Sequence, residues 1–177
     1  ALSKSIKAHE DDLLHAFQQD LGKNKVEAYA SEIGFVLKNL KLARKELKNW
    51  AKRKQVNTPL HMFPTKSYIM KEPYGTVLII GPFNYPFQLL IEPLIGAIAA
   101  GNTVILKPSE LTPNVSHVVK NIIESTFDSA YISIIEGDAE VTKQLVALPF
   151  DYIFFTGSEH VGRSIYQAAS KNLTPVT

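Results

Sequence analysis

The feature that most constrains the fold is a regular alternation of short apolar runs with longer helical patterns from Gly75 onward. Four runs rich in β-branched and aromatic residues fit strands, at 76–80, 103–106, 131–135 and 152–155. Helical patterns follow each run, at 87–100, 112–126, 139–148 and 159–170, and we expect Gly101 to end the first of them and Thr112 to cap the second. Strands buried on both faces are apolar throughout, and strand–helix alternation favours parallel pairing through right-handed crossovers. The sequence therefore predicts an α/β fold built on a doubly wound parallel sheet.

The earlier part of the chain has a different pattern, in which charged residues surround apolar positions at helical spacing. One apolar stripe of this kind consists of Ile33, Leu37, Leu40, Leu47 and Trp50. A shorter helix precedes it, and Gly22 is expected to end that helix. Residues 57–64 hold two prolines and are expected to form a loop, whereas 67–72 is a candidate short strand. We predict an N-terminal helical hairpin within residues 1–64 and an incomplete Rossmann-like domain over 65–177.

Composition excludes several kinds of site. The chain has no cysteine, which excludes disulfides, thiolate metal sites and a cysteine nucleophile within these residues. Its five histidines show no metal-ligand spacing, so no metal site is expected. Basic side chains gather on the second helical pattern: Lys38, Lys41, Arg44, Lys45, Lys48, Lys52 and Arg53. They could form a nucleic-acid face, but a formal net charge of only +2 favours a solvated helix surface and no nucleic-acid partner.

No segment has the pattern of a membrane anchor or a secretory leader. The longest apolar run, 87–100, is interrupted by Gln88, Glu92 and Pro93 and is shorter than the roughly 20 residues that span a bilayer. The first ten residues are polar and of mixed charge, unlike a signal peptide. We therefore expect no integral membrane segment in this chain and a cytoplasmic location.

In an open parallel sheet, ligands bind beyond the carboxyl ends of the strands. After the fourth predicted strand, Gly157 and Gly162 bracket a turn into a helix that Ser158 can cap. The unpaired amides at such a helix start suit a phosphate. Glycine and serine also begin helices for purely structural reasons, so both interpretations stand for this loop.

Two other loops carry candidate ligand groups. Lys107 and Glu110 follow the second strand and could hold the two hydroxyls of a ribose, or form a surface salt bridge beside Pro108. After the first strand, Gly81 to Pro86 lacks the usual glycine-rich phosphate turn. Asn84 in this segment could donate a hydrogen bond to a developing oxyanion, or simply cap the helix expected to begin at Pro86.

Taken together, these motifs resemble the aldehyde dehydrogenase superfamily. The residues that carry the resemblance are 81–86, 96–102, 107–110 and 155–158. Further stretches resemble its class 3 branch, which favours medium-chain, fatty and aromatic aldehydes: 20–23, 27–28, 31–33 and 173–177. The resemblance covers essentially the whole chain and implies the N-terminal, NAD(P)-binding half of a truncated aldehyde dehydrogenase fold.

The resemblance also implies roles for individual residues. Asn84 would be the oxyanion-hole residue, and Tyr85 would line the substrate tunnel or pack against the first helix. Lys107 and Glu110 would hold the adenosine ribose, and Ser158 would meet the pyrophosphate. The full set of expected contacts to NAD or NADP is Ile80, Gly81, Pro82, Phe83, Lys107, Glu110, Gly137, Phe155, Gly157, Ser158, Val161 and Gly162.

The sequence departs from the family pattern in two ways. Glu159 stands where threonine usually follows the serine, and Phe83 replaces a more frequent tryptophan.

The resemblance further implies that the general-base glutamate would lie just after Thr177 and the nucleophilic cysteine further on, so this fragment alone is expected to be inactive. The full-length enzyme is expected to be a homodimer. The alternatives are an acylating or semialdehyde-specific dehydrogenase of the same superfamily, and a stand-alone nucleotide-binding module without turnover.

Overall fold

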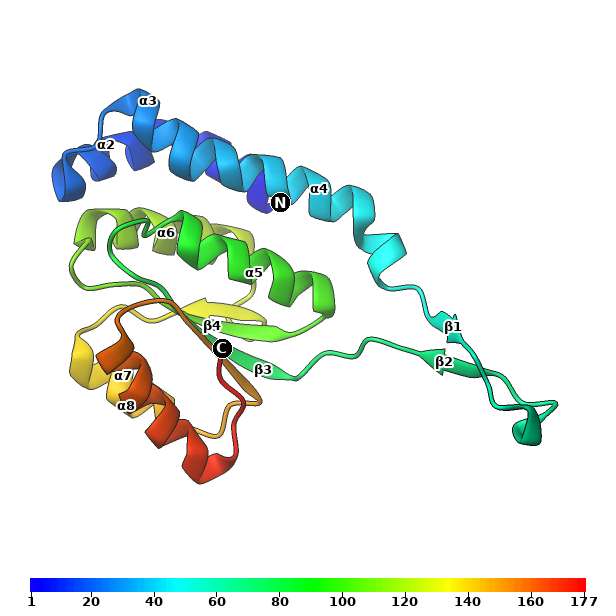
Figure 1. The fold of residues 1–177 in the computed structure, drawn as a ribbon. Coiled ribbons are helices and arrows are strands. Elements are labelled where there is room, and N and C mark those ends of the chain that lie inside the picture. Colours follow the sequence, from blue (N-terminus) through cyan, green and yellow to red (C-terminus); the bar gives the residue numbers. More distant parts are fainter.

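A computed structural model describes residues 1–177 and has a four-stranded parallel sheet at its centre (Figure 1). The strand order is β5-β4-β3-β6. The strands are β3 (Thr76–Ile80), β4 (Thr103–Lys107), β5 (Ile132–Ile134) and β6 (Tyr152–Phe155). The chain winds outward from β3 to β5 and then returns to place β6 on the other side of β3. The predicted doubly wound sheet is confirmed, with its switch point between β3 and β6.

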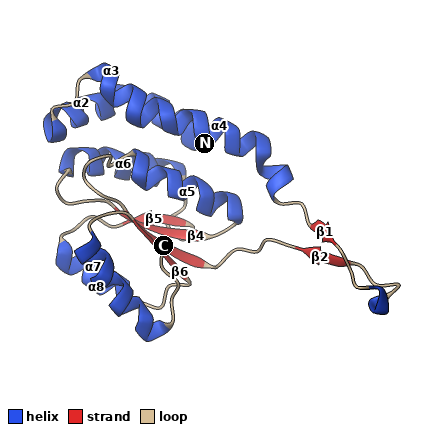
Figure 2. Ribbon diagram, in the orientation of Figure 1, coloured by secondary structure: helices blue, strands red, loops and turns tan.

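Helices cover both faces of the sheet (Figure 2). On one face lie α5 (Gln88–Ala100) and α6 (Pro113–Thr126), and on the other lie α7 (Ala139–Val146) and α8 (Glu159–Ala169). Alternate residues of β3 enter different cores: Val77 and Ile79 join a cluster of 25 buried residues, and Leu78 and Ile80 join one of 8. Burial on both faces explains why the strands read as unbroken apolar runs.

The N-terminal helices form an additional layer over α5 and α6 (Figure 1). They are α1 (Leu2–Ala8), α2 (Glu10–Leu21), α3 (Lys25–Ala28), the π-helical turn η1 (Tyr29–Ile33) and α4 (Gly34–Trp50). Gly22 ends α2 in a left-handed conformation with φ 67°, as predicted. The predicted hairpin corresponds to α2 and α4, although α1, α3 and η1 were not foreseen. Buried residues of this layer belong to the same 25-residue cluster as α5 and α6, so the two parts share one core.

The predicted apolar stripe, which runs from the end of η1 along α4, is only partly buried. Ile33 is fully buried, and Leu37 and Leu40 pack against the large core. Leu47 and Trp50 are each 40% exposed, because α4 runs beyond the end of α5 (Figure 1). The stripe therefore overstates how far the helix contacts the rest of the protein.

A two-stranded arm projects away from the sheet (Figure 1). Strand β1 (Lys54–Val56) pairs antiparallel with β2 (Ser67–Ile69), and the short 3-10 helix η2 (Leu60–Met62) lies between them. The predicted strand at 67–72 is confirmed in its first half, whereas β1 was not predicted because it is short and mostly exposed. A boundary between residues 64 and 65 falls inside this arm, and the division into two domains stays a prediction.

Helix α6 is not capped as its sequence suggests. Thr112 occupies the N-cap position, but its side chain accepts no capping hydrogen bond and its Oγ1 is buried without a partner. Instead, Asp20 at the end of α2 accepts hydrogen bonds from the Val115 amide at 2.8 Å and the Asn114 side chain at 2.6 Å. The expected Thr112 cap is thus wrong, because a distant carboxylate has taken its place.

No helix of the structure is both long enough and apolar enough to cross a bilayer.

Candidate cofactor and aldehyde site

The sheet brings the predicted loops together at its carboxyl edge. Ile80 at the end of β3 is in register with Lys107 on β4 and with Phe155 on β6. The pairing continues just past the strands, where the Gly81 amide donates to the Lys107 carbonyl and the Thr156 amide to the Ile80 carbonyl, each at 3.1 Å. The three candidate loops therefore leave the sheet side by side.

Lys107 and Glu110 form the ion pair that their spacing allows. The Lys107 side chain is only 1% exposed, and its Nζ lies 3.7 Å from a Glu110 carboxylate oxygen. The same Nζ donates to the Pro108 carbonyl at 2.7 Å. Burial lowers the pKa of Lys107, and the nearby carboxylates of Glu110 and Asp138 oppose that shift. The salt bridge expected beside Pro108 is therefore present, with a buried lysine and a carboxylate that reaches solvent.

A cavity of about 290 Å³ lies between the loops after β4 and β5. Ser109, Glu110, Glu136 and Gly137 are among the residues that line it. Gly137 has φ 152°, and a β carbon there would lie 2.6 Å from the Val141 side chain. A side chain at position 137 would therefore strain the backbone and collide with α7.

The start of α8 has the predicted capped form. Ser158 Oγ accepts a hydrogen bond from the Val161 amide at 3.4 Å. Gly157 is packed under the ring of Phe155, since a β carbon at 157 would lie 2.4 Å from Phe155 Cζ. The Ser158 interpretation as a structural cap is confirmed, and that geometry also leaves the first amides of α8 without intrahelical partners.

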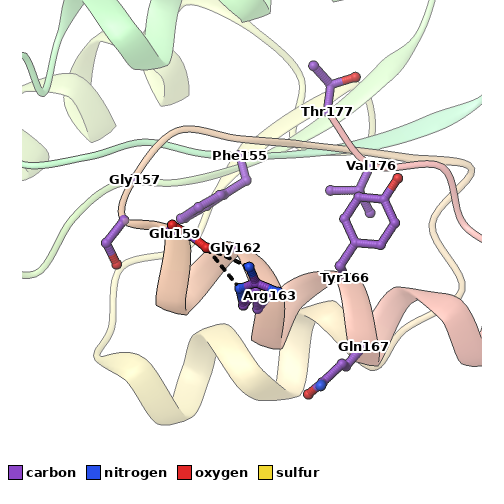
Figure 3. Close-up of a pocket in the computed structure, with 10 residues that line it drawn as sticks. Phe155, Gly157, Glu159, Gly162, Arg163, Tyr166, Gln167, Val176 and Thr177 are labelled. Atoms are coloured by element: carbon purple, nitrogen blue, oxygen red, sulfur yellow. Dashed lines mark hydrogen bonds and ion pairs between the residues drawn. The ribbon is translucent and has the colours of Figure 1, made fainter.

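A second cavity of about 550 Å³ runs along α8 (Figure 3). Phe155, Gly157, Ser158 and Gly162 line it, together with Thr177. Beside the cap, Glu159 pairs with Arg163 at 2.6 Å, so the carboxylate that replaces the usual threonine has a cation next to it (Figure 3).

The predicted contacts therefore occupy one edge of the sheet but line two cavities. Glu110 and Gly137 belong to the first, and Phe155, Gly157, Ser158 and Gly162 to the second. Several predicted contacts line neither of them: Ile80, Gly81, Pro82, Phe83, Asn84, Tyr85, Lys107 and Val161. Val161 is 42% exposed, and Phe83 and Tyr85 are exposed on the loop after β3.

Asn84 lies on that loop with its amide nitrogen unpaired. Its Oδ1 accepts a hydrogen bond from the Tyr85 amide at 3.0 Å, which turns the side chain back on its own loop. Helix α5 begins at Gln88 rather than Pro86, and Asn84 does not cap it. The capping alternative for Asn84 is wrong, because a residue from the N-terminal layer accepts the hydrogen bonds from the amides at the start of α5.

The residue that caps α5 is Glu32. Its Oε2 accepts hydrogen bonds from the amides of Phe87 at 3.1 Å and Gln88 at 2.9 Å, while Oε1 lies 2.5 Å from Lys23 Nζ. Burial raises the pKa of Glu32, and the hydrogen bonds from Lys23 and the two amides oppose that shift. Both partners of this ion pair are buried.

Lys23 extends the network to the Asn84 loop. Its Nζ donates to the Asn84 carbonyl at 2.9 Å and lies 4.2 Å from the centre of the Tyr85 ring. Tyr85 therefore packs against Lys23, which lies between α2 and α3 rather than in the first helix, and Tyr85 is 40% exposed. Lys23 and Glu32 were noted in the sequence only for their resemblance to class 3 enzymes. Nothing in their spacing signals that they meet the loop after β3.

The aldehyde dehydrogenase family profile matches residues 1–177. The chain belongs to the aldehyde dehydrogenase family. This aldehyde dehydrogenase chain is 70% identical to 4,4'-diaponeurosporen-aldehyde dehydrogenase from Staphylococcus aureus. The match covers 99% of this chain and 38% of that protein. It is 45% identical to aldehyde dehydrogenase family 3 member F1 from Arabidopsis thaliana, and the match covers 100% of this chain and 37% of that protein. A canine relative named "aldehyde dehydrogenase, dimeric NADP-preferring" is 43% identical, with 100% of this chain and 39% of that protein covered. The class 3 resemblance is confirmed.

Solved structures agree with this assignment. The substrate-bound state of Staphylococcus aureus AldH superimposes with a TM-score of 0.98 at 70% identity, over 99% of this aldehyde dehydrogenase chain and 38% of that one. A point mutant of betaine aldehyde dehydrogenase from Staphylococcus aureus, in complex with NAD+, gives a TM-score of 0.82 at 30% identity, over 99% and 35% of the two chains. The chain thus spans between a third and two fifths of the length of these relatives, at their N-terminal part.

Proposed function

We propose that this chain is the NAD(P)-binding part of an enzyme that oxidises aldehydes to carboxylic acids. The observation that carries the proposal is the meeting of three different groups at one sheet edge. They are the buried Lys107 with its exposed partner Glu110, the helix start at Ser158, and the unpaired amide of Asn84. Such an edge, at the switch point of a doubly wound sheet, is where ligands of these folds bind.

The residues present fit a dinucleotide. An ammonium donor and a carboxylate acceptor suit the vicinal hydroxyls of a ribose, and the first amides of α8 suit a pyrophosphate. Gly157 and Gly137 keep the backbone bare at both cavities, and no side chain could replace either without a collision. We propose cofactor contacts from the same set of residues that the family resemblance implies, with Ile80, Gly81, Pro82 and Phe83 on the nicotinamide side and Val161 on the adenine side.

In the proposed reaction, Asn84 acts on the aldehyde. Its Nδ2 donates a hydrogen bond to the carbonyl oxygen, where negative charge develops when a nucleophile attacks. When bound, the nicotinamide cofactor supplies the acceptor for the hydride that aldehyde oxidation releases. This chain has no cysteine, so the thiolate nucleophile of the proposed thiohemiacetal route would lie outside it. The family resemblance implies that the general base would lie outside it as well. Tyr85 is proposed to line the approach to Asn84.

The substrate class and assembly are also proposals. The class 3 resemblance implies a medium-chain, fatty or aromatic aldehyde, and the 70% identical relative is named for 4,4'-diaponeurosporen-aldehyde. The canine relative is named as dimeric and NADP-preferring, which supports a homodimer that uses NAD or NADP. A cytoplasmic location is proposed with them.

The test is turnover by the full-length enzyme that carries this segment. With medium-chain and aromatic aldehydes it should reduce NAD+ or NADP+ without coenzyme A, and Asn84→Ala should lower kcat about a hundredfold or more, the scale of losing one oxyanion donor. A strict need for coenzyme A would favour an acylating dehydrogenase. Binding of NAD+ with no turnover of any aldehyde would favour a nucleotide-binding module, and an unchanged kcat in Asn84→Ala would remove that residue from catalysis.

A further inference from the structure

A buried ion pair in the N-terminal layer reaches across the interface to the loop that holds Asn84. We propose that Lys23 and Glu32 are positioning residues, which fix the loop after β3 so that the Asn84 amide faces the aldehyde. This inference rests on the proposed role of Asn84 in aldehyde oxidation. It adds the helical layer, which makes none of the proposed substrate contacts, to the machinery of that site.

The contacts all fall on the few residues around Asn84. Lys23 holds the Asn84 carbonyl at 2.9 Å and covers the ring of Tyr85, the next residue. Glu32 holds the amides of Phe87 and Gln88. At the other end of the loop, the Gly81 amide is held by the Lys107 carbonyl. The sheet thus fixes where the loop begins, and the N-terminal layer fixes the segment from Asn84 onward.

These contacts leave the side-chain amide nitrogen of Asn84 without a partner. The carbonyl is bound by Lys23 and the side-chain Oδ1 by the Tyr85 amide, whereas Nδ2 makes no hydrogen bond within the chain. Because the side-chain oxygen accepts from the Tyr85 amide, Nδ2 is the end of the Asn84 side chain that is left to donate to a ligand. A preorganised donor is what stabilises an oxyanion without reorganisation during reaction.

Stability alone does not call for this arrangement. Glu32 is 0% and Lys23 9% exposed, and removing two charges from water costs free energy that their attraction often fails to recover. Well-packed apolar residues of similar size are frequently as stable or more so. Apolar residues would fill the space, but they could not bind the Asn84 carbonyl or the two amides.

The experiment uses the full-length enzyme that carries this segment. In the double variant Lys23→Met/Glu32→Gln both charges are removed, yet the glutamine oxygen can still accept from the Phe87 and Gln88 amides, so α5 keeps a cap. The bond to the Asn84 carbonyl is lost. We expect kcat to fall about tenfold or more, within the range that a misplaced reacting group causes, while the Kd for NAD+ changes less than about twofold. The single variant Lys23→Arg keeps a buried donor, so its kcat should lie between the kcat of the double variant and that of the unaltered enzyme.

The same double variant is then made in an Asn84→Ala background. If Lys23 and Glu32 act through Asn84, the charge removal should change kcat by less than about twofold there, because residues that act as a unit are not additive. Asp20→Asn is the matched control, since it weakens the contact of the same helical layer with α6 and should leave kcat unchanged.

The outcomes separate this inference from the proposed function. An equal loss of kcat in both backgrounds, or no loss while Asn84→Ala remains impaired, overturns the positioning role alone. An enzyme whose kcat does not respond to Asn84→Ala overturns the proposed role of Asn84 itself. If the double variant fails to fold, Lys23→Arg and Glu32→Gln are compared singly in both backgrounds, where the same non-additivity is expected.

Discussion

The carboxylate of Asp20 lies 2.8 Å from the amide of Val115, 95 residues later in the chain, and caps helix α6. Glu32 does the same for helix α5. The N-terminal layer therefore supplies an acceptor to the first turn of each helix that it covers. Negative charge at these positions also complements the helix dipoles. A helix start can be completed by a segment that no local sequence rule would consider.

Replacing Asp20 by alanine should destabilise the protein by about 1–2 kcal/mol, the scale of losing an N-cap. The lower free energy of unfolding would be measured by chemical denaturation. Thr112→Val is the matched control at the same helix, because Thr112 Oγ1 is buried without a partner and has no hydrogen bond to lose. If Thr112→Val cost as much as Asp20→Ala, the capping role would belong to the threonine after all.

Gly157→Ala should destabilise the protein by roughly 1–3 kcal/mol, because the new methyl group would force the Phe155 ring to move. A second substitution, Phe155→Leu, should recover part of that loss by making room. Gly96→Ala in α5 is the control, since a β carbon there meets nothing within 4 Å and should stabilise the helix by about 0.5–1 kcal/mol. Thermal and denaturant unfolding would be compared for Gly157→Ala, Phe155→Leu, their combination and Gly96→Ala. Additive effects at 155 and 157 would contradict the contact.

Glu110→Gln in the full-length enzyme should weaken NAD+ binding about tenfold and NADP+ binding much less. A carboxylate accepts a hydrogen bond from a ribose 2′-hydroxyl but repels a 2′-phosphate. The two dissociation constants would be measured by calorimetry. Glu136→Gln changes another carboxylate of the same cavity and should affect both cofactors alike. Equal effects of Glu110→Gln on both cofactors would show that Glu110 does not read the 2′ position.

The stability of the Glu92→Gln variant, relative to the unaltered protein, should increase as the pH rises from about 4 to 7. Burial raises the pKa of Glu92, against the opposing hydrogen bond from Asn39. A carboxyl group whose pKa is higher in the folded state contributes stability below its unfolded pKa of about 4.3, and that contribution is lost as the pH rises through the folded value. Glutamine keeps an acceptor for Asn39 and does not titrate.

The measurement for Glu92→Gln is the difference in Tm from the unaltered protein across this pH range. Glu124→Gln, on an exposed position of α6, controls for the loss of one negative charge. A Tm difference for Glu92→Gln that stays constant with pH, or shrinks as the pH rises, would contradict the effect of burial.

Much of the fold could be predicted because its strands are buried on both faces. Val77 to Ile80 are buried without exception, and a run of this kind has few other uses than the centre of a parallel sheet. Helix ends at Gly22 and Gly101 were also readable, since each residue takes the left-handed conformation that favours glycine. Strand β1 had no such signal, because its residues pair only with the neighbouring strand and face solvent.

The site was less accessible to sequence reasoning. Lys107, Glu110 and Ser158 stand beside their partners in the chain, so local spacing was enough to predict the ion pair and the cap. The contacts of Lys23 with Asn84 and of Asp20 with Val115 join residues far apart in sequence, and only the packed layers bring them together. The proposed roles of the cofactor contacts remain predictions.

The helical layer also sets a limit on how small a working dinucleotide module of this kind can be made. A shortened protein starting at Gly75 would keep every strand of the sheet and both cavities. It would also expose to solvent the apolar faces of α5 and α6 that the N-terminal layer covers. The first turns of these two helices would lose their capping carboxylates, Glu32 and Asp20. Such a truncation would thus also remove the contacts of Lys23 and Glu32 with the segment that begins at Asn84.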